Sequence, residues 1–213
     1  MGEAVASPLR RIAPCRKVGK PRVSQTVGRS DSSESGEKIE WRLSYYGMKN
    51  RENNYAFIDS NNLNLSIRDL GWKLDYRKFY VYLKDKHHIA KAYLFLGFLP
   101  ENQEMYKKLQ DDGYTLVFKP ILQYKDGKVK GNCDAELVLQ AMIDFVKYDK
   151  ALIVSGDGDF YCLINYLYGK QKLKFVLVPN QNKYSALIKK SAKEKLLFMN
   201  NLRHKLEYKN NQK

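Results

Sequence analysis

The sequence predicts an α/β fold with a mainly parallel central sheet and helices on both of its faces. Beyond residue 54, short apolar runs typical of strands alternate with segments in which apolar residues recur at helical spacing. One of these runs, Ala151–Val154, is apolar throughout, which is typical of a strand buried on both faces of a parallel sheet. Alternation of strands and helices implies right-handed crossovers between parallel neighbours.

Each element of this pattern is expected at a definite place in the chain. Strands are expected at Tyr55–Asp59, Ile89–Leu96, Tyr114–Phe118, Ala151–Val154 and Lys174–Val178. Helices are expected at Tyr76–Lys86, Asn102–Asp112, Asp134–Lys147 and Phe160–Tyr168, with a basic helix from about Ser185 to Lys205. A chain of 213 residues with 44% apolar side chains has the size of one domain with tails.

The first 50 residues differ in composition from the rest of the chain. They contain few aliphatic side chains and a Ser-rich, charged stretch at Ser30–Lys38 that lacks apolar periodicity. We therefore expect a disordered basic extension over residues 1–50, a folded domain over 51–205 and a C-terminal tail over 206–213. The basic side chains of the extension are those of either a nucleic-acid-binding arm or a solvated tail.

The net charge of +15 is concentrated at the two ends of the chain. Residues 1–50 carry 10 basic and 5 acidic side chains, residues 51–169 carry 16 of each, and residues 170–213 carry 12 basic and 2 acidic. Lys and Arg neutralise phosphates and release counterions, so this distribution favours a polyanionic partner such as RNA. Solubility alone is the other explanation of the charge.

The composition also bounds the compartment of the protein. No run approaches the roughly 18 apolar residues that span a bilayer, and the N-terminus lacks the apolar region of a secretory signal. The chain has 3 cysteines, an odd number without metal-type spacing, which argues against a disulfide framework or a structural zinc site. We expect a soluble, cytoplasmic protein with no membrane partner.

Carboxylates follow two of the predicted strands at the point where each strand ends. Asp59 ends the first strand, and Asp157 and Asp159 follow Ala151–Val154. Ligands in open α/β sheets bind beyond the carboxyl ends of the strands. A fourth acid, Asp134, opens the longest internal helix, where the helix dipole alone would also favour it. The four carboxylates converge if the two strands are neighbours, and their mutual repulsion then requires a cation.

The residue types of this cluster select the metal and the chemistry. Carboxylates prefer hard cations such as Mg²⁺ or Mn²⁺, and no His or Cys of the chain has zinc-ligand spacing. Such an ion polarises a phosphoryl oxygen and activates water for in-line attack, which points to phosphodiester hydrolysis. The sequence contains neither the phosphate loop GxxxxGK[ST] nor the dinucleotide fingerprint GxGxxG.

Three motifs in order carry a resemblance to a known family: FIDSNNLN at 57–64, KGNCDAELVL at 130–139 and IVSGDGDF at 153–160. On these motifs, the chain from about Asn54 to Lys195 resembles the NYN domain, the LabA-like branch of the PIN-like ribonuclease superfamily. The resemblance implies a PIN-like three-layer α/β/α fold. It also implies a ribonuclease that depends on Mg²⁺ or Mn²⁺ bound by an acidic cluster.

The resemblance assigns roles to individual positions. The catalytic and metal-binding residues would be Asp59, Asp134, Asp157 and Asp159. The residues expected to bind or position the substrate are Asn61, Asn62, Ser155 and Lys130, the last in the lysine-rich connection 119–131. Many relatives carry a further Asp six residues after Asp134, where this chain has Gln140. Asp144 is a poor substitute, because ten helical residues span about 15 Å.

Other classes of protein fit the motifs less well. A haloacid-dehalogenase-like phosphatase needs a second Asp where Asn61 stands, and a phosphoacceptor receiver domain needs a Lys where Pro179 and Asn180 follow the last predicted strand. The stronger alternative is an NYN-domain RNA-binding or regulatory protein with weak or no activity. It would bind RNA through the basic C-terminal helix, with Lys189, Lys190, Lys193, Lys195 and Arg203. The sequence leaves endonuclease and exonuclease action open.

Overall fold

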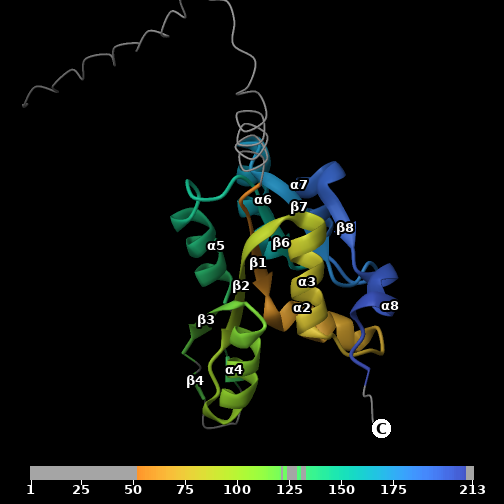
Figure 1. Ribbon diagram of the computed structural model, residues 1–213. Coiled ribbons are helices and arrows are strands. Elements are labelled where there is room, and N and C mark those ends of the chain that lie inside the picture. The colour runs from red at the N-terminus through yellow and green to blue at the C-terminus, as the bar shows by residue number, and fades with distance from the viewer. Residues whose placement is uncertain (1–51, 121, 124–128, 131–132, 210–213) are drawn as a thin grey trace, which may run out of the picture. The chain divides into compact units, whose positions relative to one another are not determined.

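A six-stranded parallel sheet forms the centre of the fold (Figure 1). The computed structural model describes residues 52–120, 122–123, 129–130 and 133–209, so the expectation for residues 1–50 lies outside the described residues. The strands are β1 (Asn54–Asp59), β2 (Ile89–Gly97), β3 (Thr115–Lys119), β6 (Ala151–Val154), β7 (Leu173–Val178) and β8 (Leu196–Phe198). They are arranged in the order β3-β2-β1-β6-β7-β8. A separate antiparallel pair consists of β4 (Leu122–Gln123) and β5 (Val129–Lys130).

Helices pack on both faces of this sheet, which gives three layers (Figure 1). The helices of one layer are α2 (Ser60–Asp69), α3 (Tyr76–His87), α4 (Gln103–Asp111) and α8 (Arg203–Leu206). Those of the other layer are α5 (Asp134–Ile143), α6 (Tyr161–Gly169) and α7 (Ala186–Ala192). In β1, Ala56 and Ile58 join the core under the first layer and Phe57 joins the core under the second. A strand buried on both faces has no polar face, which explains the continuous apolar runs.

The structure confirms the α/β class and the five predicted strands. Four of the predicted helices are present, although α5 ends at Ile143 rather than at Lys147. The basic helix over Ser185–Lys205 is wrong. The helix ends at Ala192, Lys193 turns the chain with φ 49° and ψ −124°, and Leu196–Phe198 pairs with β7 as an additional parallel strand. Burial of these three apolar side chains against the sheet outweighs helix propensity.

The order of the strands reverses between β1 and β6. From β1 the chain proceeds outward through β2 and β3, and it then returns to the other side of β1 as β6. These two strands pair in parallel with Ile58 level with Val154, as the convergence of the aspartates required. The crevice at such a reversal, beyond the carboxyl ends of the strands, is where open α/β sheets bind their ligands.

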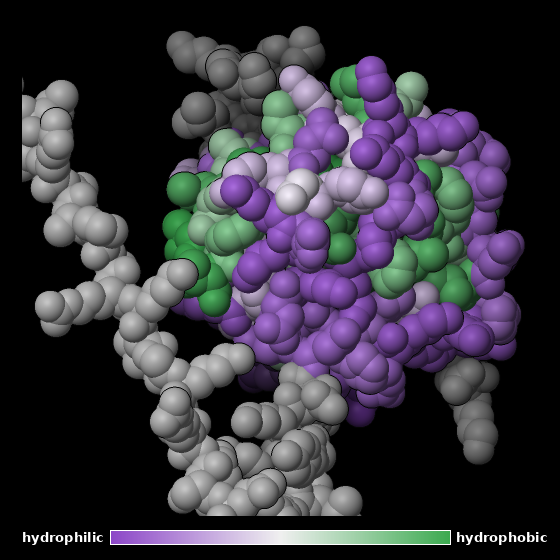
Figure 2. All heavy atoms as spheres, turned by 90° about the horizontal axis from the view of Figure 1, so that it is seen from above, coloured by the Kyte–Doolittle hydropathy of each residue, from purple (hydrophilic) through white to green (hydrophobic). Residues whose placement is uncertain are grey.

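Helix α5 is apolar on its outer side as well as on its inner side. Leu137 and Ala141 are buried against the sheet, while Leu139 and Ile143 are 60% and 54% exposed and Val146 in the following turn is 85% exposed. Figure 2 shows hydrophobic side chains on the left, the side on which α5 lies in Figure 1, and further hydrophobic side chains on the right of the same face. No helix within the described ranges has the length and apolar character required to cross a membrane.

Candidate metal centre

Asp59 is held where β1 ends and α2 begins. Its carboxylate caps the helix, because Oδ1 accepts a hydrogen bond from the Asn62 amide at 3.1 Å. Oδ2 accepts a second hydrogen bond, at 3.2 Å, from the hydroxyl of Ser155, a fully buried residue just beyond β6. Groups at the ends of both neighbouring strands therefore orient this carboxylate.

The turn after β6 is connected to the same residues. The Ser155 hydroxyl accepts a hydrogen bond from the Asp157 amide at 3.1 Å, and the Asn62 side-chain oxygen accepts one from the Gly156 amide at 2.9 Å. Asp157 in turn caps the short 3₁₀ helix η2 (Gly158–Phe160) by accepting from the Asp159 amide at 3.1 Å. These bonds hold the backbone of the turn beside the end of β1 and fix the Asp157 carboxylate.

Two glycines let this turn pack against the segment before α7. The Gly156 carbonyl accepts a hydrogen bond from the Ser185 amide at 3.0 Å. A methyl group added at Gly158 would lie 2.5 Å from the Ser185 hydroxyl and 2.9 Å from its Cβ. Ser185 was not among the predicted site residues. The signals that point to it are the two glycines of the GDG segment and the capping serine at the start of a helix.

Three carboxylates meet beyond this turn. Asp134, Asp157 and Asp159 each offer an oxygen atom, and the three oxygens lie within 4.8 Å of one another. Asp134 comes from the first turn of α5, whereas the other two aspartates follow β6. The group therefore joins two segments that are far apart along the chain. Hard divalent cations bind oxygen at about 2.0–2.6 Å, so a group of this size could hold one such ion.

Asp59 lies next to this group rather than within it. Burial and, to a lesser extent, the negative charges of Asp134 and Asp157 raise the pKa of the Asp59 carboxyl to about 6, against the hydrogen bonds from Asn62 and Ser155, which lower it. A carboxylate that is costly to ionise among other carboxylates is stabilised by a nearby cation. The electrostatics of the site therefore fit a bound divalent ion.

The other side chains at the site do not alter this preference for a hard cation. Cys133 precedes Asp134, and burial raises the pKa of its thiol to about 11, which keeps it protonated at neutral pH. A protonated thiol is a poor metal ligand. The donor set therefore consists of carboxylate oxygens, which is the set that Mg²⁺ and Mn²⁺ prefer.

The remaining predicted residues lie at different positions. Asn62 and Ser155 form part of the hydrogen-bonded frame, whereas Asn61 is exposed on the first turn of α2. Lys130 is in β5, and its side chain lies outside the described part of the chain. The metal-binding and catalytic roles of the four aspartates stay predictions.

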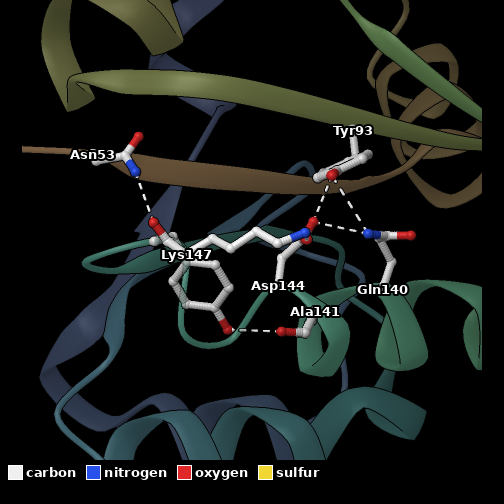
Figure 3. Close-up of polar contacts among 7 residues, drawn as sticks. Asn53, Tyr93, Gln140, Ala141, Asp144 and Lys147 are labelled. Carbon is white, nitrogen blue, oxygen red and sulfur yellow. Dashed lines mark hydrogen bonds and ion pairs between the residues drawn. The ribbon is translucent and has the colours of Figure 1, made fainter.

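Asp144 belongs to a separate polar network (Figure 3). Its carboxylate accepts hydrogen bonds from the Tyr93 hydroxyl at 2.5 Å, from the Gln140 amide at 2.8 Å and from the Lys147 ammonium at 2.7 Å. The residue is 1% exposed and forms the C-cap of α5. Gln140 is thus bound to Asp144 at the far end of the helix from Asp134, and neither residue adds an oxygen ligand to the acidic group.

Comparisons with known proteins agree with this architecture. A model of the NYN domain matches residues 55–197. The Low amplitude and bright protein LabA of Synechococcus elongatus is 30% identical over 125 residues, which are 54% of this chain and 67% of that protein. A crystal structure of a protein of unknown function from Vibrio parahaemolyticus has a TM-score of 0.59 and 21% identity, over 70% of this chain and 94% of that chain. The last likeness concerns the fold.

Proposed function

The chain belongs to the NYN domain family, in its LabA-like branch within the PIN-like nuclease superfamily, and from this premise we propose that it is a divalent-metal-dependent ribonuclease. The observation that carries the proposal is the group of three carboxylate oxygens within 4.8 Å at the strand reversal. The basic C-terminal part of the chain supports a polyanionic substrate, because it carries 12 basic and 2 acidic side chains.

The proposed chemistry divides the work among the four aspartates. Asp134, Asp157 and Asp159 would hold Mg²⁺ or Mn²⁺, which supplies phosphoryl polarisation and an activated water when bound. Asp59 lies beside them with a pKa raised by burial to about 6, close to neutral pH, which suits a group that takes a proton from the attacking water. A proton acceptor is most effective when its pKa lies near the operating pH.

The polar residues around the cluster would serve different purposes. Ser155 is fully buried and bonded to Asp59 and to the Asp157 amide, so we assign it the positioning of carboxylates rather than contact with RNA. Asn62 holds the turn through Gly156 in the same way. Asn61 is exposed beside Asp59, and we propose that it contacts the substrate together with Lys130.

A second candidate function is RNA binding without efficient cleavage. The observation in its favour is Gln140, which stands where many relatives carry an additional Asp and which donates its amide to Asp144. A site with one carboxylate fewer binds a cation less tightly. The two candidates share the fold and the RNA ligand and differ in turnover.

A cleavage assay distinguishes the two candidates. Purified protein is incubated with labelled RNA and DNA in Mn²⁺, Mg²⁺ or EDTA, beside Asp157→Asn and the matched control Asp111→Asn on the exposed end of α4. We expect metal-dependent RNA cleavage that falls by about 100-fold or more in Asp157→Asn and is unchanged in the control. Salt-sensitive RNA binding without cleavage under any metal would favour the second candidate. Cleavage that persists in Asp157→Asn would remove the acidic group from the mechanism.

A further inference from the structure

A shallow hollow lies beyond the carboxyl end of β8. Its volume is about 560 Å³, and its lining consists of Asn200, Asn201, Arg203, His204, Glu207 and Lys209. The acid among these residues, Glu207, accepts hydrogen bonds from the Arg203 guanidinium at 2.8 and 3.1 Å. Exposed amides and cations therefore dominate the hollow, which is a suitable chemistry for phosphates and for the edges of bases.

The hollow lies on the same edge of the sheet as the acidic centre. All six strands are parallel, so their carboxyl ends meet at one edge, and only β7 separates β6 from β8. Two strand spacings correspond to about 10 Å. The loops between the two places are bonded to one another, because the Gln181 amide donates to the Asn200 side chain at 2.8 Å and the Ser185 amide donates to the Gly156 carbonyl at 3.0 Å.

The two sides of the acidic centre differ in charge along this edge. The loops after β7 and β8, residues 180–185 and 199–204, contain no acidic residue. Lys183, on the first of them, pairs with Asp69 at 2.9 Å on the surface, and a phosphate can compete with such an exposed pair. On the other side, beyond β2, Glu101 and Glu104 are exposed. Lys119 also lies on that side, where it pairs with Glu136 at 3.3 Å, so the feature that favours a path toward β8 is the absence of acidic residues from the two loops.

The wall of the hollow is held by the C-terminal segment. The Asp75 amide donates to the Leu206 carbonyl and the Tyr208 amide donates to the Lys73 carbonyl, both at 2.8 Å. Tyr208 stays 41% exposed, with the Lys73 ammonium 5.0 Å from its ring centroid. Tyr208 lies between two lining residues, Glu207 and Lys209, but does not itself line the hollow.

We propose that single-stranded RNA bound at the acidic centre runs across the carboxyl edge of β7 and β8 and that the hollow binds its flanking nucleotides. This inference rests on the proposed function, since it names the path of the substrate of the same site. Within the hollow, Arg203 and Lys209 bind phosphate. The basic segment thereby acts through its end, beyond β8, and not through the single helical face that its sequence suggested.

Charge reversal on the two edges of β8 tests this path. The test variant is Arg203→Glu with Lys209→Glu in the hollow. The matched control is Lys193→Glu with Lys195→Glu, which makes the same change of charge just before β8, at the opposite edge. Both pairs are introduced into the full chain carrying Asp157→Asn. Affinity is measured by fluorescence anisotropy for RNA of about 12 and about 3 nucleotides, over a range of salt.

The expected result is a dependence on RNA length. The hollow variant should bind the longer RNA about tenfold more weakly with a shallower salt slope, and the control should change its affinity by less than about twofold. The shorter RNA should bind all variants alike. The proposed path is overturned if both pairs of substitutions weaken RNA affinity equally, or if the pair in the hollow does not weaken it.

Cleavage and binding by wild-type protein, measured beside these variants, separate this inference from the proposed function. Wild-type protein that binds the longer RNA through the hollow but cleaves nothing in any metal refutes the nuclease and keeps the path. If wild-type protein cleaves RNA only with metal, but the hollow variant binds the longer RNA as tightly as its parent, the proposed nuclease activity is kept and the path is refuted.

Discussion

Asp59 and Asp144 are two poorly exposed aspartates whose surroundings shift their ionisation in opposite directions. Burial, together with the neighbouring Asp134 and Asp157, raises the pKa of Asp59 to about 6. Burial would also raise the pKa of Asp144, but hydrogen bonds from Lys147, Tyr93 and Gln140 outweigh it and lower the pKa. The fold itself neutralises the charge of Asp144, whereas at Asp59 it gathers further negative charge.

This difference separates a structural carboxylate from one prepared for a ligand. The buried carboxylate of Asp144 connects α5 to β2, and its hydrogen bonds to protein donors replace those that water would make. The charge of Asp59, which is poorly exposed and lies beside other carboxylates, lowers the stability of the metal-free protein, and binding of a cation offsets this loss. Substitutions at the two places should therefore have effects of opposite sign on the free energy of unfolding.

The largest of these effects is expected for Asp144→Ala. It removes the acceptor shared by Tyr93, Gln140 and Lys147, and it should lower the free energy of unfolding by about 3 kcal/mol. Urea unfolding measures the change, with exposed Asp85→Ala as the control that should stay within about 0.5 kcal/mol. A loss below about 1 kcal/mol for Asp144→Ala would show that the network contributes little.

A smaller effect is expected for Gln140→Asp, which restores the acid found in many relatives. In this chain the new carboxylate would face Asp144 in place of an amide donor, so we expect a loss of about 2 kcal/mol in the free energy of unfolding. We also expect no gain in the rate of RNA cleavage, because the Gln140 amide is directed to Asp144 in Figure 3. A variant that cleaves faster than wild type would place residue 140 in the metal centre, and the Asp144 network could then no longer be treated as separate from that centre.

The smallest effect, of opposite sign, is expected for Asp59→Asn in EDTA. The folded pKa of Asp59, about 6, exceeds its ordinary value of 3.8, so the folded state holds the proton more tightly. The stability that this protonation contributes is complete below about pH 4 and is lost as the pH rises through 6. At pH 7.5 the uncharged variant should be more stable than wild type by about 1 kcal/mol.

Thermal unfolding of both proteins at pH 4 and pH 7.5 checks this sign. The advantage of Asp59→Asn should disappear at pH 4, and Mg²⁺ or Mn²⁺ should stabilise wild type more than the variant at pH 7.5. A variant that is less stable than wild type at pH 7.5 in EDTA would mean that the capping bond to Asn62 outweighs the cost of the buried charge.

The success of the sequence-based predictions depended on how local their signals were. Ala151–Val154 and Tyr55–Asp59 were correct because a run of apolar residues reports burial on both faces directly. The elements that were not predicted include α2, the β4–β5 pair, β8 and α8. Helix α2 starts with Ser-Asn-Asn, which are poor helix formers, and is capped by Asp59. Strand β8 has three residues that were predicted to be helical, and they form a strand because they pair with β7.

The sequence by itself determined the α/β class, the strand ends and the residue types that make a hard-cation site, because these follow from hydropathy and from the chemistry of single side chains. Only the tertiary structure decided which acids meet. It brought Asp134 to Asp157 and Asp159, kept Asp59 just behind them, and gave Asp144 to Tyr93 and Gln140. It also placed part of the basic segment at the edge of the sheet, as strand β8. The physical reason is that a carboxylate has the same formula everywhere, while its pKa and its partners depend on burial and on charges brought near by the fold.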